Sequence, residues 1–390
     1  LSPDEREYLT RLAKTDTGLA RFTFDELKSD LRFTSSSWVG VVELRDVIII
    51  ICPKFNNKFR ALTDMICFVE GLPFYSHEDV SGREQDLAFD ELLAALFLSE
   101  VDKLLQTGIV REYLAEEDSL RQLRGRPDII MNIRKNLARP TQIYCHFQEL
   151  EANIPENQVI LSALEITCGF RVQKGTRRKA GALRHEFNQF CQAYSGAEWP
   201  TFNYNRLNAH YRPAHSLAWY IFQQKFTNDL LHFGHKGFYS LLVDMNDLFE
   251  KFVFTYLKRF LPRDCQVEYS RRITNAIMAK GKSYRHIIPD IIINIPGAKC
   301  AWAVDAKYKP YGENLIATGD MFQLSFYAQY LRGNQEELPR SFILYPKYKD
   351  SLTEDTRVIN LLPGRRAESI LSAVSVDIEE LLELVKSKDW

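Results

Sequence analysis

One segment of the chain places charged side chains at the ends of two strongly apolar runs, and this limits what the region can fold into. The runs cover residues 291–295 and 301–308, and both are typical of buried strands. Asp290 precedes the first run, while Asp305 and Lys307 lie within the second. Side chains alternate along a strand, so Asp305 and Lys307 share one face. A hairpin between the two runs would set Asp290 opposite Asp305.

The chemistry of these three side chains indicates a metal-dependent site. Buried charges are costly unless they are paired or bound to a metal, and two adjacent carboxylates repel unless a cation lies between them. Hard oxygen ligands of this kind suit Mg²⁺. We therefore expect Asp290 and Asp305 to hold the metal and Lys307 to act on a water beside it, which is the equipment of metal-assisted phosphodiester hydrolysis. The alternative is a surface hairpin with ordinary salt bridges.

The elements around this segment are predicted in a definite order. Helix, three strands, helix and strand are indicated at residues 248–260, 266–273, 291–295, 301–308, 320–331 and 341–346. This αβββαβ order resembles the core of the PD-(D/E)xK nuclease superfamily, and the two carboxylates and the lysine fall where that superfamily carries its site. The resemblance implies a restriction-endonuclease-like core in the C-terminal part of the chain.

Longer stretches of the chain are similar to the McrC family, the nuclease subunits of McrBC modification-dependent restriction systems. The similar segments, in chain order, are 39–54, 123–126, 155–157, 238–253, 305–309 and 323–327. The resemblance covers most of the chain and is weakest at about residues 174–214. Site-specific relatives carry similar subunits, and that branch of the family stays open.

The resemblance to the McrC family implies a function and a set of partners. It implies an Mg²⁺-dependent endonuclease that cleaves double-stranded DNA within a hexameric McrB-like AAA+ GTPase complex and stimulates the GTPase. GTP would bind to the partner, and this chain would bind no nucleotide itself. Double-strand cutting needs two sites, so dimerisation of complexes is expected. Two other functions stay open: a GTPase-activating assembly subunit with a latent nuclease, and a helicase-associated PD-(D/E)xK exonuclease.

The same resemblance assigns further roles near the predicted metal site. The Ala306 carbonyl would complete the metal ligands, with Mn²⁺ as an alternative to Mg²⁺, and Glu250 on the first helix would join them. Gln323 and Tyr327, four residues apart, share a helix face that would line the site or the DNA. The plain alternatives are a solvent-facing Glu250 and ordinary packing for Gln323 and Tyr327.

Two groups of basic residues are candidates for contacts with macromolecules. Arg177, Arg178 and Lys179 lie in a run of positive charge, which would contact DNA phosphates or form a solvated face. Arg124 and Arg126 flank a glycine, and the family resemblance suggests that they belong to the region that docks on the partner ring. The alternative for Arg124 and Arg126 is an ordinary charged turn.

Composition sets the class of the chain and its division into domains. The 390 residues are 45% hydrophobic, enough for two or three domains with cores of their own, and the mixture of helical and strand patterns predicts an α+β or α/β class. We expect a strand-rich, partner-docking region at 1–150 with a helix at about 83–105, a mainly helical region at 151–235, and the nuclease domain at 236–390. The formal net charge of −1 provides no global attraction to DNA, so any DNA contact must come from local patches.

The seven cysteines are scattered without a CxxC pair, and no apolar run approaches the roughly 20 residues of a membrane span. We therefore expect a cytoplasmic protein that makes no use of a membrane.

Three shorter segments give local predictions. Residues 127–130 (PDII) copy the start of the nuclease motif, but no D-x-K comes after them, so a turn and a strand are expected there. Residues 276–283 fit a permissive phosphate-loop pattern, yet the chain continues as a strand, so a solvated hairpin turn is predicted. The spacing of apolar residues in the tail at 367–385 predicts an amphipathic helix.

Overall fold

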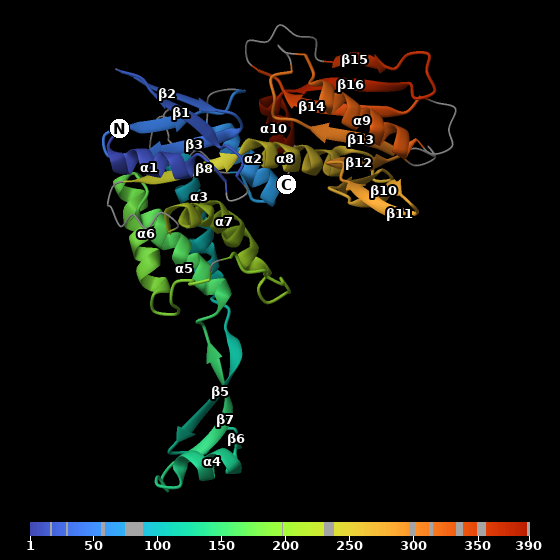
Figure 1. Ribbon diagram of the computed structural model, residues 1–390. Coiled ribbons are helices and arrows are strands. Elements are labelled where there is room, and N and C mark those ends of the chain that lie inside the picture. The colour runs from blue at the N-terminus through green and yellow to red at the C-terminus, as the bar shows by residue number, and fades with distance from the viewer. Residues whose placement is uncertain are drawn as a thin grey trace. The chain divides into compact units, whose positions relative to one another are not determined.

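The computed structural model shows a mixed α+β protein (Figure 1). It describes residues 1–15, 18–28, 30–55, 59–74, 89–196, 198–229, 238–295, 301–311, 315–332, 338–348 and 356–387. The chain forms two compact units: the first comprises residues 1–92 and 234–390, and the second comprises residues 93–233.

The largest sheet of the described residues has six strands and lies in the first unit. Its strand order is β15-β16-β14-β13-β12-β9. In that order the strands cover Thr356–Leu361, Ser369–Val376, Arg340–Pro346, Ala301–Ala306, Ile291–Asn294 and Gln266–Tyr269. β13, β14 and β16 run parallel to one another, and the remaining pairs are antiparallel. Helix α9 (Thr318–Leu331) packs against the three parallel strands, while α8 (Met245–Phe260) packs against β13 and β9.

A smaller sheet in the first unit joins residues that are far apart in the sequence. Strand β3 (Trp38–Glu43) pairs with β4 (Ile48–Ile51) on one side and with β8 (Tyr239–Asp244) on the other. Gly40 makes the second pairing feasible, because a Cβ at this position would lie 1.8 Å from the carbonyl oxygen of Leu241. Other elements of the first unit are α1 (Pro3–Leu12), β1 (Phe22–Glu26), β2 (Leu31–Ser35), α2 (Phe59–Glu70) and α10 (Ile378–Ser387).

The second unit combines a helical body with a long β-hairpin, which is drawn in green in Figure 1. The helices, of which α3 begins within the first unit, are α3 (Phe89–Thr107), α5 (Pro155–Cys168), α6 (Lys174–Phe187), η3 (Ala209–Tyr211) and α7 (Arg212–Asp229). The hairpin consists of β5 (Glu112–Leu120) and β7 (Ile143–Glu151). Its outer end carries β6 (Arg126–Pro127) and the short helix α4 (Ile129–Asn136), and we call this end the fingertip.

Two local predictions are wrong. Residues 129–133 are helical, because the Asp128 side chain accepts a hydrogen bond from the amide of Met131 (2.9 Å) and so caps the first turn of α4. The tail is not one helix: β16 precedes α10, and Leu371 and Ala373 on alternate positions of β16 are buried. That period of two is the pattern of a strand.

The division into domains also differs from the three consecutive segments 1–150, 151–235 and 236–390. Pairing of β3 with β8 brings the first part of the chain together with the last, and the middle of the chain forms its own unit. The helix expected at about 83–105 is α3, and residues 83–88 lie outside the described part of the chain. The strand expected at 266–273 ends at Tyr269. The predicted hairpin turn near residue 280 is confirmed, since β10 (Ile273–Ala279) pairs with β11 (Lys282–Ile287).

Candidate active site

The register of β12 and β13 brings the two predicted carboxylates together. Ile291 pairs with Val304, so the next step of the ladder sets Asp290 opposite Asp305. The backbone amide of Ala306 donates to Asp290 Oδ2 at 3.2 Å, which fixes the first carboxylate against the end of β13. Both acidic side chains therefore lie where two central strands of the six-stranded sheet meet.

Lys307 completes the group. Its Nζ lies 3.0 Å from Asp305 Oδ2 and 3.6 Å from Asp290 Oδ2. Its backbone amide donates to the carbonyl of Leu344 (2.8 Å), which continues the parallel ladder between β13 and β14. The structure thus gathers the predicted catalytic residues Asp290, Asp305 and Lys307 at one end of the sheet.

Burial makes Asp305 an unusual carboxylate. Its side chain is 1% exposed, and neither carboxylate oxygen accepts a hydrogen bond from the described residues. The Lys307 ammonium lies within ion-pair distance of one of these oxygens and attracts the negative charge of the carboxylate. Burial, and next the charge of Asp290, raise the pKa of Asp305 despite the opposing effect of Lys307. Burial would lower the pKa of Lys307, but Asp305 and Asp290 outweigh it and raise that pKa.

Two buried carboxylate oxygens without donors are a suitable partner for a small divalent cation. Asp290 and Asp305 supply hard oxygen ligands, and the carbonyl of Ala306 is next in the chain. A larger cluster is not visible: within the described ranges, no three or more His, Cys, Asp or Glu side chains gather with the geometry of a metal site. The donor set therefore fits Mg²⁺, which binds proteins through one or two carboxylates and keeps several waters.

Glu250 on α8 lies within the electrostatic environment of the same group. Burial raises the pKa of Glu250, and a hydrogen bond with Tyr269 opposes this shift. The charges of Lys307 and Asp305 also act on it, with opposite signs. The side chain is half-buried, and its role as a metal ligand stays a prediction.

The predicted pair on α9 is connected to the segment that carries Asp290. Gln323 Nε2 donates to the Tyr327 hydroxyl (2.9 Å), and that hydroxyl donates to the carbonyl of Ile288 (3.3 Å). Burial raises the pKa of Tyr327, the hydrogen bond from Gln323 opposes the rise, and the charges of Asp305 and Asp290 add to it. Gln323 and Tyr327 therefore border the site from the helix side.

Sequence reasoning missed several side chains beside the site. Tyr269 shares a hydrogen bond with Glu250. Lys309 Nζ forms an ion pair with Asp320 Oδ2 (2.9 Å), and the Tyr311 hydroxyl also contacts Asp320. The sequence could have indicated Lys309, because it lies two residues after Lys307 and residues two apart on an extended chain lie on the same face. Asp320 gives no such signal, since an acidic residue in the first turn of a helix is common for electrostatic reasons alone.

The basic run at 177–179 lies in the second unit, on helix α6, and its side chains are largely exposed. Lys179 Nζ pairs with Asp102 Oδ2 at 3.1 Å, and Arg177 Nη2 donates to the carbonyl of Phe170 at 3.3 Å. Two of the three basic residues therefore have partners inside the second unit. Their contact with DNA stays a prediction.

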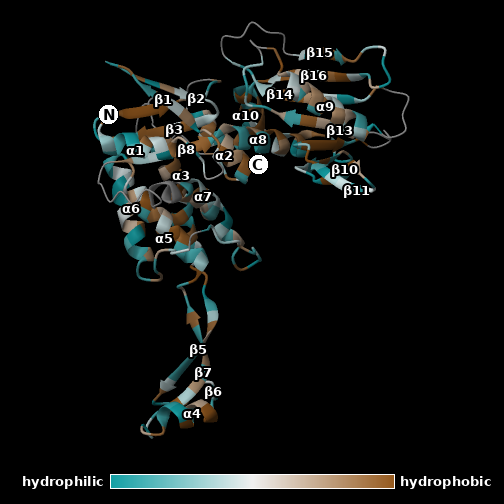
Figure 2. Ribbon diagram, in the orientation of Figure 1, coloured by the Kyte–Doolittle hydropathy of each residue, from teal (hydrophilic) through white to brown (hydrophobic). Residues whose placement is uncertain are grey.

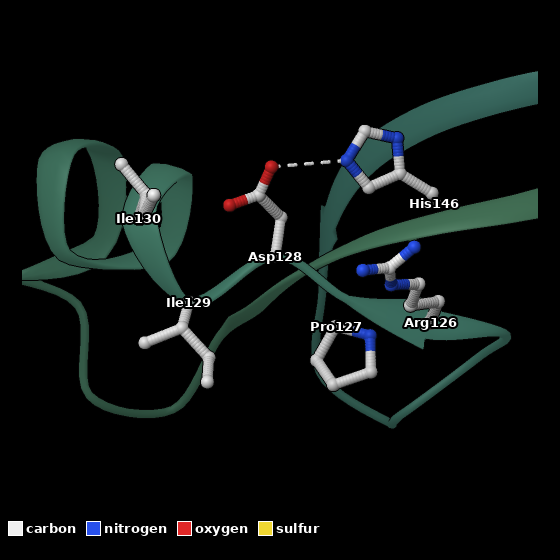
Figure 3. Close-up of a pocket in the computed structure, with 6 residues that line it drawn as sticks. All are labelled: Arg126, Pro127, Asp128, Ile129, Ile130 and His146. Carbon is white, nitrogen blue, oxygen red and sulfur yellow. Dashed lines mark hydrogen bonds and ion pairs between the residues drawn. The ribbon is translucent and has the colours of Figure 1, made fainter.

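Arg124 and Arg126 lie at the fingertip. Arg124 pairs with Glu149 (3.2 Å) and stacks over the Phe147 ring, with 4.5 Å between the guanidinium carbon and the ring centroid. Arg126 borders a hollow of about 690 Å³ that is lined by Arg126, Pro127, Asp128, Ile129, Ile130 and His146 (Figure 3). In this hollow Asp128 Oδ2 meets His146 Nε2 at 3.1 Å. The amide of Met131 and next His146 hold the pKa of Asp128 below its usual value.

Apolar side chains are exposed on the same fingertip. Ile129, Ile130, Ile133 and Leu137 have exposed fractions of 72%, 66%, 59% and 81%. Figure 2 shows hydrophobic residues on α4 at the end of the hairpin. None of the helices in the described ranges is long and apolar enough to cross a membrane.

These features define a class: an α+β protein that carries an acid–lysine group at the end of a sheet and an apolar surface at the end of a hairpin. A family model described as McrBC 5-methylcytosine restriction system component matches residues 33–346. The chain belongs to this McrBC family.

Two solved structures resemble the chain, and the first of them shares its fold. One similar chain is in the refined half-complex from the tetradecameric assembly of Thermococcus gammatolerans McrB AAA+ hexamers with bound McrC. The identity is 18%, the TM-score is 0.62, and the match covers 94% of this chain and 85% of that chain. A second is in the Thermococcus gammatolerans McrBC complex, with 21% identity, a TM-score of 0.48, and 62% and 71% of the two chains covered. No curated protein matches the chain.

Proposed function

We propose that this chain is the nuclease subunit of a McrBC-like restriction complex and cleaves double-stranded DNA with Mg²⁺. The observation that carries the proposal is the state of Asp305, a buried carboxylate whose two oxygens have no hydrogen-bond donor among the described residues. One ammonium, that of Lys307, faces both Asp305 and Asp290, so this pair of carboxylates carries excess negative charge that a divalent cation would balance. Asp290 and Lys307 lie beside Asp305, where a phosphodiester hydrolase needs a second ligand and a fixed positive charge.

The elements around the site support a PD-(D/E)xK core. Along the chain, α8, β9, β12, β13, α9 and β14 come in the αβββαβ order of that superfamily, with β10 and β11 inserted after β9. In this assignment β12 and β13 present the acidic residues, and α9 borders the site through Gln323 and Tyr327.

Each site residue has a role that follows from its charge and its burial. Mg²⁺, or Mn²⁺ in its place, would be held by Asp290, Asp305 and the Ala306 carbonyl, with Glu250 as a further carboxylate, and would supply a Lewis acid to the phosphate. Lys307 retains its proton at neutral pH, because the neighbouring carboxylates raise its pKa. It therefore acts as a hydrogen-bond donor that orients the attacking water and stabilises negative charge on the phosphoryl oxygens. Attack in line with the scissile bond expels the 3′ oxygen.

The fingertip supports the second part of the proposal, which is docking on a McrB-like AAA+ hexamer that binds GTP. Exposed isoleucines and a leucine on and beside one short helix are typical of a protein–protein contact. Arg126 borders the adjacent hollow, and Arg124 is held over Phe147 nearby. A surface of this kind also favours the alternative function, in which GTPase activation is the main output of the chain and the nuclease is latent.

One experiment separates these functions. The chain is mixed with its AAA+ GTPase partner, GTP, Mg²⁺ and modified closed-circular DNA, and cleavage and GTP hydrolysis are measured separately. Lys307→Ala should reduce cleavage by about a thousandfold, in the range seen when one transition-state donor is lost, and should leave GTPase stimulation unchanged. Arg366→Gln removes an exposed charge in the turn between β15 and β16 and serves as the control.

The other outcomes identify the rival functions. Cleavage by Lys307→Ala at the rate of the unmodified chain would remove the proposed active site. GTPase stimulation without cleavage by the unmodified chain would favour the activating subunit. Intact circular DNA together with degraded linear DNA would favour an exonuclease, because a circle offers no end.

A further inference from the structure

The β10–β11 hairpin is a strongly basic surface feature of the first unit. Residues 271–288 contain no Asp or Glu, although the chain as a whole has a formal net charge of −1. Their positively charged residues are Arg271, Arg272, Lys280, Lys282 and Arg285, with His286 beside them. The hairpin is inserted between β9 and β12, so its charge is concentrated just before Asp290 and the strand that Asp290 leads into.

The base of this hairpin is fixed to the core. Ile287 is buried, and Ile273, Ala276 and Ile277 pack against the same apolar cluster, which also contains Tyr327. At the other end, Lys280 and Gly281 have φ angles of +49° and +74° and form a two-residue turn between Ala279 and Lys282. An apolar base and a tight turn hold the exposed part of the hairpin in a defined direction.

One face of the hairpin carries a row of polar and cationic groups. Lys282, Tyr284 and His286 alternate along β11, so they share a face, and all three are exposed. Arg272 Nη2 lies 3.3 Å from His286 Nδ1, which places the guanidinium beside this row. The Tyr284 side chain is 70% exposed. We call Arg272, Lys282, Tyr284 and His286 the hairpin face.

Most of the cationic side chains of the hairpin form no ion pair within the described structure. Arg271 forms an ion pair with Glu268 at 3.0 Å. Among the residues that the structure describes, no acidic side chain forms an ion pair with Arg272, Lys280, Lys282 or Arg285. Four cationic groups in water next to a site for an anionic substrate increase the local concentration of that substrate.

The hairpin face adjoins the candidate active site through a short piece of chain. Asp290 lies three residues after Ile287, so their Cα atoms lie at most about 11 Å apart. The Tyr327 hydroxyl donates to the carbonyl of Ile288 within this link, which ties it to α9. A phosphodiester strand that reaches Asp290 is therefore within range of the base of the hairpin.

We propose that the hairpin face is a docking surface for the phosphates of duplex DNA, which it holds beside the candidate active site. Arg272 and Lys282 would contact phosphate oxygens as cations, and the Tyr284 hydroxyl would donate to a further phosphate oxygen. The inference rests on the proposed function, since it specifies how that DNA substrate is held. It predicts binding without sequence preference and with a strong dependence on salt.

The test is a titration of the full-length chain with fluorescent duplex DNA, without divalent metal so that no cleavage occurs, over a series of salt concentrations. The double variant Arg272→Gln, Lys282→Gln should bind at least about tenfold more weakly at low salt and lose about two units of the slope of log affinity against log salt. Arg366→Gln, which also removes an exposed arginine of the first unit, should reproduce the unmodified chain.

Several results would overturn this inference while leaving the nuclease proposal intact. One is an unmodified chain that binds no duplex DNA, or a double variant that matches the Arg366→Gln control, while Lys307→Ala still abolishes metal-dependent cleavage. Preferential competition by duplex RNA would assign the face to another nucleic acid. Loss of partner binding with unchanged DNA affinity would assign it to a protein. Failure of the nuclease proposal has a separate readout, because the unmodified chain would then show no metal-dependent cleavage whatever its DNA affinity.

Discussion

The same four residues, Pro-Asp-Ile-Ile, occur twice in the chain and fold in two different ways. At 127–130 they end a short strand and begin helix α4, whereas at 289–292 they lead into β12, an interior strand of the six-stranded sheet. Asp128 accepts from an amide of its own helix, while Asp290 accepts from the amide of Ala306 on the neighbouring strand. The outcome depends on the next segment of the chain, which is either a helix that a side chain can cap or a second apolar run that can complete a sheet.

The two copies also differ in where their isoleucines lie, and this separates their roles. Ile291 and Ile292 are buried in the first unit, while Ile129 and Ile130 are exposed on the fingertip. The buried copy of the sequence holds charged side chains in fixed positions where water is excluded, which favours catalysis. An exposed copy offers apolar surface, which suits contact with another protein. One peptide thus supports a candidate active site in one unit and a candidate docking surface in the other.

The largest expected effect is on DNA cleavage, and it distinguishes Asp305 at the candidate active site from Asp128 at the fingertip. Asp305→Asn preserves shape but removes the buried negative charge, so metal-dependent cleavage should fall by about a thousandfold in the assembled complex. Asp128→Asn, the matched change at the fingertip, should leave the cleavage step itself unaltered when DNA and partner are saturating. Gel quantification of cleaved circular DNA measures both. Equal loss in the two variants would contradict a division of roles between the regions.

An intermediate effect is expected at the fingertip. Ile130→Ser removes an exposed apolar contact and should weaken binding to the GTPase partner by about tenfold or more, as expected for the centre of an interface. The melting temperature should change little, since the side chain has little packing to lose. Val358→Ser alters a similarly exposed apolar side chain on β15 and is the control. If both variants retain full affinity in a pull-down titration with the partner, the fingertip is not the docking surface.

Much of the first unit was predictable because its signals are local. Apolar runs at 291–295 and 301–308 predict buried strands, and a period of two along the second run puts Asp305 and Lys307 on one face. The 3.0 Å approach of Lys307 to Asp305 is in line with that reasoning. The prediction for the tail was wrong because the Leu and Ile spacing between 367 and 385 fits both periods, and only pairing with β14 and β15 makes residues 369–376 a strand.

The parts that could not be predicted depend on contacts between distant segments. Nothing near Trp38–Glu43 indicates that its neighbour is Tyr239–Asp244, so the two-unit division was missed. Glu250 and Tyr269 lie on different elements, and their hydrogen bond depends on how α8 packs against β9. The basic hairpin was visible as sequence, but its importance comes from its position before Asp290 and from its anchored base.

The smallest expected effect concerns stability and tests the buried carboxylate directly. Burial raises the pKa of Asp305 above its usual value near 3.8, so the folded state holds this proton more tightly than the unfolded chain. The contribution of Asp305 to the free energy of unfolding should therefore fall as the pH rises from about 4 towards neutrality, by at most about 1.4 kcal/mol per pH unit, and it is measured as the difference between the unmodified chain and Asp305→Asn. At neutral pH, Mg²⁺ at ten times its dissociation constant should restore about 1.4 kcal/mol. Urea unfolding of the full chain with and without Mg²⁺ measures both effects.

The matched variants decide whether this response belongs to the buried carboxylate. Asp305→Asn should lose the Asp305 contribution to the pH dependence and the Mg²⁺ response, because the amide neither titrates in this range nor supplies a negative charge to the cation. Asp128→Asn should retain the Asp305 contribution and the Mg²⁺ response, because Asp128 lies in the second unit and its lowered pKa affects stability only as the pH falls into the acid range. An unchanged Mg²⁺ response in Asp305→Asn would mean that the cation binds elsewhere, and the contrast between the two regions would then not rest on a metal.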